Sequence, residues 1–169
     1  MVKKTHIIIA IILIGVGIVG IWVMPSLFQS EEKRVKKQFH LLSGWVSKDS
    51  GENTFTMAHK IQNIGTLFAD KCELTSNLDF LSGNYTPEEI SNYAARGRLA
   101  FSELKLKFFD FDISFPETDV AKVTLTARLT GRLTTGEDVD ETRELESLLN
   151  RVEKKWLFSQ VEIIEILKK

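Results

Sequence analysis

An unbroken apolar segment near the amino terminus constrains this chain more than any other feature. From Ile7 to Met24 every residue is Ile, Val, Leu, Ala, Gly, Trp or Met, and the apolar character continues to Phe28. As a helix, residues 7–28 would reach roughly 33 Å, enough for a hydrocarbon core of about 30 Å. A cleaved signal peptide is the alternative, but its apolar region is only about 7–15 residues long. The run therefore predicts a retained single-pass transmembrane helix over residues 7–28.

The charges on either side of this segment bear on its orientation. Residues 1–6 form a short basic tail that contains Lys3 and Lys4 and no acid, whereas residues 33–37 contribute four more basic side chains. The basic tail favours a cytoplasmic amino terminus, and a long domain can cross the membrane despite nearby charge. We expect residues 29–169 to form one domain outside a bacterial-type cytoplasmic (inner) membrane. The reverse orientation would place residues 33–37 against anionic headgroups.

The rest of the composition excludes several classes of protein. The 169 residues carry 22 basic and 23 acidic side chains, so the domain lacks the clustered positive charge of a nucleic-acid binder. A single cysteine, Cys72, cannot form an internal disulfide or supply a cysteine-based zinc site. No metal-ligand cluster, phosphate loop or Ser-His-Asp order is apparent, so we expect no metal and no cofactor.

Three helices are predicted in the first half of the domain. Apolar spacing places them over Glu31–Lys48, about Thr54–Ala69 and from Thr86 to about Phe101. The last begins with the residues of a capping box, in which a threonine and a glutamate three residues later cap each other's backbone. Its inward stripe contains Ile90, Tyr93, Ala94, Gly97 and Phe101, whereas Arg96 and Arg98 read as ordinary polar positions.

Strands account for the remainder. A short strand over Lys71–Leu78 places Cys72 inward as an inert thiol. The alternation from Leu104 changes phase between Phe108 and Phe109, which indicates a β-bulge. Two strands, about 119–134 and 138–152, form a hairpin, and a last strand covers 156–167. Charge favours a hairpin register that pairs Arg132 with Asp140, Thr130 with Thr142 and Arg128 with Glu144.

Two short sequence segments and the order of the predicted elements resemble those of a known superfamily. Leu67–Asp70 looks like a helix end that enters a first strand, and Arg151–Ser159 looks like a final hairpin with Trp156 opening the last strand. This arrangement resembles the nuclear transport factor 2-like superfamily, which has a cystatin-like fold and includes ketosteroid isomerases and polyketide cyclases. The resemblance implies an α+β fold in which three helices pack on a curved antiparallel sheet, as a cone, with a cavity between them.

The catalytic residues that this resemblance implies are missing. The position of the isomerase-like aspartate falls on Ser76, Asp79 lies three residues later in an expected turn, and His40 and His59 lie on polar helix faces. We therefore expect no catalytic set. Two charged residues do point inward in the predicted hairpin, Glu141 and Arg143. With Tyr93 they are candidates for lining the cavity mouth and binding a ligand's polar group; the alternative is a salt bridge at the rim.

These observations favour a non-catalytic binding or scaffold module, anchored in the lipid bilayer by residues 7–28. The layout is similar to that of the single-span assembly subunits of type IV secretion systems, so an envelope protein complex is a possible setting. Expected partners are another protein or a second copy bound through the sheet face, and a small apolar ligand. The alternative is an isomerase, cyclase or dehydratase that uses Glu141 or Asp79 as its base.

Overall fold

The computed structural model describes residues 30–76 and 82–166 of the chain. The chain divides into two compact units, Met1–Arg34 and Val35–Lys169, and the fold presented here is that of the second. No helix among the described residues has the length and apolar character needed to cross a membrane. The predicted span, residues 7–28, and Asp79 both lie outside the described residues.

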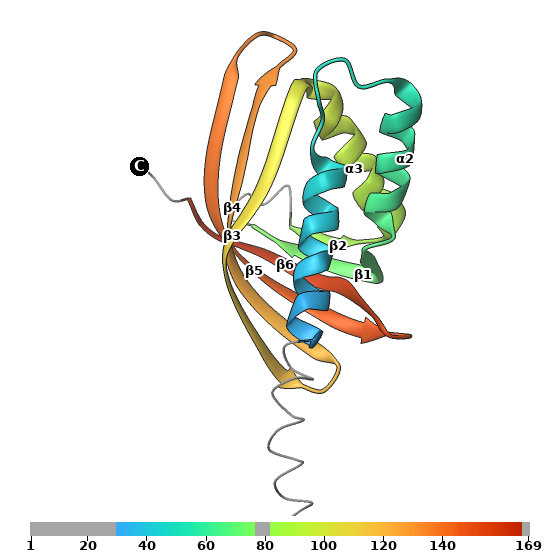
Figure 1. Ribbon diagram of the computed structural model, residues 1–169, viewed down its shortest axis with the longest axis vertical. Coiled ribbons are helices and arrows are strands. Elements are labelled where there is room, and N and C mark those ends of the chain that lie inside the picture. The colour runs from blue at the N-terminus through green and yellow to red at the C-terminus, as the bar shows by residue number, and fades with distance from the viewer. Residues whose placement is uncertain (1–29, 77–81, 167–169) are drawn as a thin grey trace, which may run out of the picture. The chain divides into compact units, whose positions relative to one another are not determined.

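Three helices lie on one face of a single sheet (Figure 1). The first covers residues 30–46, α2 is Thr54–Gly65 and α3 is Pro87–Ala100, so the three predicted helices are confirmed. Helix α2 is shorter than expected because β1 begins at Phe68. The capping box of α3 is present: the Thr86 side chain accepts from the Glu89 backbone, and the Glu89 side chain accepts from the Thr86 backbone.

The sheet contains six strands in the order β2-β1-β6-β5-β4-β3. Their bounds are Phe68–Thr75 for β1, Gly83–Tyr85 for β2, Phe101–Glu117 for β3, Val120–Leu133 for β4, Asp138–Val152 for β5 and Lys155–Ile166 for β6. The sheet is mixed, since β1 runs parallel to β6 while the other neighbours are antiparallel. The prediction of a purely antiparallel sheet is therefore wrong at this pair, because the last strand returns alongside the first.

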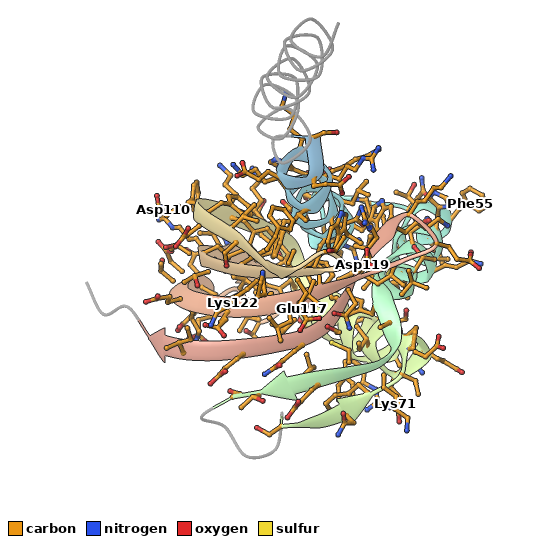
Figure 2. All side chains as sticks on the ribbon, turned by 90° about the horizontal axis from the view of Figure 1, so that it is seen from below. Phe55, Lys71, Asp110, Glu117, Asp119 and Lys122 are labelled. Carbon is orange, nitrogen blue, oxygen red and sulfur yellow. The ribbon has the colours of Figure 1, made fainter. Side chains whose placement is uncertain are left out.

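The long edge strand β3 contains a β-bulge, as predicted, but the bulge follows Phe109 instead of preceding it. The pairing with β4 shifts between Phe109 and Asp112, and Asp110 adopts a positive φ of 54°. Asp110 lies at the periphery of the domain (Figure 2). Phe109 itself is 42% exposed, so it does not belong to the inward series that resumes at Phe111. The one extra residue lets β3 bend while keeping aromatic side chains on the helix side before and after the bulge.

The hairpin of β4 and β5 differs from the predicted register by two residues. Arg132 lies opposite Asp138 and Arg128 opposite Thr142, so the predicted pairings of Arg132 with Asp140 and Arg128 with Glu144 are wrong. The turn lies one residue nearer the amino terminus than predicted, because the backbone N–H of Leu133 bonds to the backbone oxygen of Glu137. Gly136 takes the left-handed conformation in it, with a φ of 95°. A slip of two residues preserves the side-chain faces, so the inner face is as predicted.

The core lies between the helices and the inner face of the sheet. Phe39 of the first helix makes edge-to-face contacts with Phe108, Phe111 and Phe158, with ring centroids 4.9–5.4 Å apart. Trp156 and Phe158 of β6 are buried with Val123 and Leu125 of β4. These side chains form the core between the helices and the sheet, and a pocket lies farther along the inner face, toward the turn between β4 and β5.

Candidate functional site: an inner-face pocket

A pocket of about 300 Å³ lies on the inner face of the sheet, where β3, β4, β5 and β6 meet side by side. Cross-strand pairing places its walls on one face, because Leu129 lies opposite both Leu106 and Glu141, and Leu145 opposite Ile163. Its lining residues are Leu106, Ala127, Leu129, Glu141, Arg143, Leu145 and Ile163. An apolar hollow of this size with two convergent charged groups has the character of a small-molecule site.

Glu141 and Arg143 supply the polar end of this pocket. They are two residues apart on β5, so both side chains project to the same face, as expected. Nη2 of Arg143 lies 3.2 Å from Oε2 of Glu141, and the two side chains are 25% and 50% exposed. A pair this open to water is weak, so it can exchange partners at little cost.

Tyr93, the third residue of the predicted site, does not line this pocket. It lies on α3 and is 50% exposed, and its ring packs edge-to-face on Tyr85 with centroids 5.4 Å apart. The guanidinium of Arg96 lies 5.9 Å from the Tyr93 ring centroid. The structure thus brings Glu141 and Arg143 together and leaves Tyr93 in a separate surface cluster on α3.

Arg98 has a structural position that sequence reasoning missed. The side chain is 1% exposed, and its Nη1 lies 2.5–2.8 Å from the backbone oxygens of Trp45, Val46 and Ser47, at the end of the first helix. Its Nη2 bonds to the carboxylate of Glu52, which is itself only 4% exposed. Reading Arg98 as an ordinary polar helix position is therefore wrong.

Lys60 completes this buried charge cluster. Its Nζ lies 2.6 Å from Oε2 of Glu52 and 2.9 Å from the backbone oxygen of Ser47. Burial raises the pKa of Glu52, but the hydrogen bonds from Lys60 and Arg98 outweigh it, so the pKa of Glu52 lies below its ordinary value. The cluster ties the first helix to α2 and α3, which is a structural role rather than a site for a ligand.

Other chemically active residues lie apart from the pocket. Cys72 is buried, as predicted, and burial raises the pKa of its thiol to about 12. His59 bonds to Asn63 on an exposed helix face, and Ser76 bonds to Ser82 beyond the end of β1. Among the described residues, no group of three or more His, Cys, Asp or Glu side chains could hold a metal ion.

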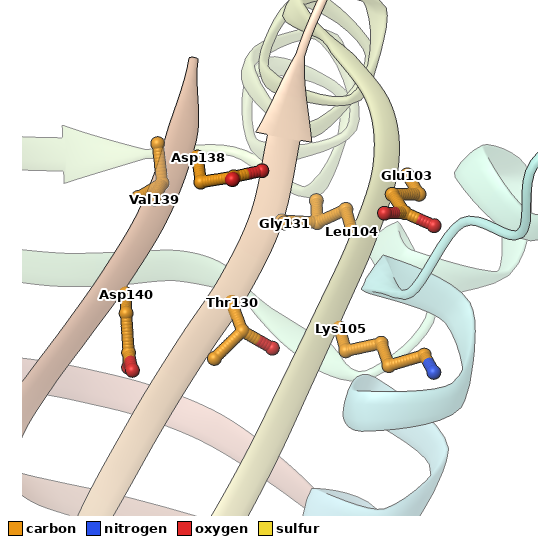
Figure 3. A pocket seen from close by; sticks show the side chains of 8 residues that line it. All are labelled: Glu103, Leu104, Lys105, Thr130, Gly131, Asp138, Val139 and Asp140. Carbon is orange, nitrogen blue, oxygen red and sulfur yellow. The ribbon is translucent and has the colours of Figure 1, made fainter. Parts of the chain in front are cut away.

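A second hollow lies at the distal end of β3, β4 and β5, with its polar residues on the other face of the sheet (Figure 3). Two of the carboxylates that line it, Asp138 and Asp140, are already engaged: Asp138 lies 2.8 Å from Arg132, and Asp140 lies 2.6 Å from Arg128. The hollow passes over Gly131, which has no side chain. Because Asp138 and Asp140 have cationic partners within the sheet, we assign it no ligand.

Comparison with known proteins identifies the fold. No protein-family model and no curated protein matches the sequence. Solved structures do match. One is an NTF2-like protein with a cystatin-like fold from Novosphingobium aromaticivorans, with a TM-score of 0.63 and 8% identity over 80% of this chain and 82% of that one. The domain has the nuclear transport factor 2-like fold.

Two further structural neighbours carry the names of enzymes. A hexachlorocyclohexane dehydrochlorinase from Novosphingobium barchaimii aligns with a TM-score of 0.65 and 11% identity, over 83% of this chain and 88% of that one. A candidate scytalone dehydratase from N. aromaticivorans aligns with a TM-score of 0.63 and 15% identity, over 83% and 86%. At these identities the likeness shows the fold alone. Function in this chain must therefore be argued from its own pocket.

Proposed function

We propose that this domain binds a small, mostly apolar ligand in the inner-face pocket, with Arg143 and Glu141 at the ligand's polar end. The observation that carries the proposal is that five aliphatic side chains and one weak, partly exposed ion pair line the same pocket. Anchoring by residues 7–28, with the domain outside a cytoplasmic membrane, belongs to the same proposal. Protease digestion of the domain in intact spheroplasts would support that topology, and full protection would contradict it.

A cysteine in the pocket wall tests ligand binding. In the full-length chain in lipid nanodiscs, Leu129→Cys places a thiol in the pocket, and Thr130→Cys places one on the opposite face. Native Cys72 is buried and does not compete for maleimide. Octanol should slow maleimide labelling at position 129 and leave position 130 unchanged. Equal labelling with and without octanol at position 129 would contradict the proposal.

An enzyme of the lyase or isomerase kind is the second candidate, and the two enzyme-named neighbours favour it. Glu141 is the carboxylate that could take up a proton from a substrate in this pocket. Its side chain is half exposed, so the pocket does not exclude water from it. Chloride release from hexachlorocyclohexane that is abolished by Glu141→Gln would favour this candidate. Octanol protection without turnover would favour binding.

Self-association or docking of a protein through the outer face of the sheet is a further expectation. That face carries cross-strand ion pairs, including Lys122 with Glu146 at 2.8 Å and Arg128 with Asp140 at 2.6 Å. A partner for it would need to be polar and charged rather than apolar. Sedimentation of the full-length chain at low and high salt tests this: a salt-sensitive dimer supports it, and a monomer at both contradicts it.

A further inference from the structure

We propose that the ligand is a single-chain aliphatic carboxylate, whose carboxylate group replaces Glu141 as the partner of Arg143. This inference rests on the proposed function and adds the chemical class of the ligand. The walls, the state of the arginine and the geometry of the strand each support it.

The walls select for a flexible aliphatic chain. They consist of leucine, isoleucine and alanine side chains from four strands, with no aromatic ring among them. Aromatic side chains are concentrated elsewhere, around Phe39 in the core. A pocket of about 300 Å³ lies at the small end of ligand sites, so a single chain of about eight carbons is a suitable occupant.

Among the described arginines of the sheet that form ion pairs with carboxylates, Arg143 has the longest contact. Among the described residues its hydrogen-bonding partner is Glu141, through one contact of 3.2 Å. By comparison, Arg128 holds Asp140 through two contacts of 2.9 and 2.6 Å, and Arg132 holds Asp138 at 2.8 Å. Charge-assisted N–H···O contacts are ordinarily about 2.7–2.9 Å long. Arg143 is therefore the guanidinium with capacity for a better partner.

The strand geometry explains why the internal pair is poor. Glu141 and Arg143 project side by side from one strand, so their charged ends meet at an angle set by the backbone. A free carboxylate is not tethered and can face the guanidinium with both oxygens. Arg143 is three-quarters covered, whereas Glu141 is half exposed, so Glu141 can turn to water when it is displaced.

The test compares two ligands of the same chain length. In the Leu129→Cys chain, octanoate should slow maleimide labelling at a concentration about tenfold lower than octanol, because the ionic contact adds to the same chain burial. Arg143→Gln should abolish this preference, and Arg143→Lys should retain part of it. Glu141→Gln should increase the preference several-fold, because it removes the internal competitor for Arg143.

The outcomes separate this inference from the proposed function. Protection by octanol with no preference for octanoate overturns the carboxylate inference and leaves the apolar site supported. A preference that survives Arg143→Gln overturns it as well, because the carboxylate would then bind elsewhere. If neither ligand protects position 129, both proposals are wrong. Unchanged labelling at Thr130→Cys in each background shows that the sheet is intact.

Discussion

Replacing Arg98 with leucine should destabilise the domain far more than replacing an exposed arginine of the same helix, because the Arg98 side chain is buried. The substitution removes the contacts of Nη1 with three backbone oxygens at 2.5–2.8 Å. It also leaves Glu52, whose side chain is 4% exposed, with Lys60 as its remaining cationic partner. Breaking one partner of a buried ion pair costs about 3–5 kcal/mol, and we expect a loss in this range for Arg98→Leu.

Arg96→Leu is the matched control, because Arg96 lies two residues away on α3 and is exposed. Its effect should stay within about 0.5 kcal/mol. Urea unfolding of the full-length chain in detergent, followed by the fluorescence of Trp45 and Trp156 in a Trp22→Phe background, measures both. An Arg98→Leu loss no larger than that of Arg96→Leu would refute the reasoning. The double variant Arg98→Leu/Glu52→Leu should recover part of the loss, because no carboxylate is then left buried.

Three further predictions follow from local geometry. The pKa of Glu52 lies below its ordinary value of 4.5, so its contribution to stability is present above that pH and is lost as the pH falls through the lowered value; Glu52→Gln should flatten acid unfolding followed by circular dichroism, and an unchanged profile would contradict this. Gly131→Ala should lower the melting temperature, because its Cβ would clash with the backbone oxygen of Glu103, whereas Gly97→Ala, on an open helix surface, should raise it slightly; equal shifts would show that this clash is unimportant. Cys72 should resist maleimide in the native chain and react after urea unfolding, and fast native labelling would contradict its burial.

Local patterns in the sequence predicted most of the elements and their faces. The helix over 30–46, α2 and α3 follow apolar spacing, and the Thr86 and Glu89 capping pair follows from residue types three positions apart. The bulge in β3 follows from the phase change of its aromatic residues. These features depend on neighbours within one or two turns or one strand, which is the range that periodicity describes.

Features set by distant parts of the chain were not predicted. Strand β2, Gly83–Tyr85, is too short to show alternation, and the parallel pairing of β1 with β6 joins segments about ninety residues apart. The hairpin register depended on cross-strand charge, but Arg128 reaches diagonally to Asp140 rather than to the residue directly opposite it. The assumption that opposite charges lie directly across from each other therefore predicted a register that differs by two residues from the observed one.

The candidate site was likewise predicted where local alternation determines it and missed where distant contacts do. Alternation along β5 placed Glu141 and Arg143 on the inner face, where the pocket lies. Tyr93 was expected beside them because it lies three residues after the inward-facing Ile90, but its ring packs on Tyr85 and is half exposed. Arg98 falls eight residues after Ile90 and so lies on the buried stripe, which was a usable signal. A charged residue on such a stripe needs a buried partner, and Glu52 lies in a loop that periodicity does not describe.

The most direct test of the central claim is the location of an aliphatic ligand on the domain. Methyl-labelled full-length chain in nanodiscs, mixed with octanoate, should give intermolecular nuclear Overhauser effects between the ligand chain and the methyl groups of Leu129, Leu145 and Ile163. Leu148 should give none, because side chains alternate along β5 and that of Leu148 lies on the opposite face of the sheet from the pocket. Contacts to Leu148 without contacts to Leu129 and Leu145 would contradict the assignment of the inner-face pocket as the binding site.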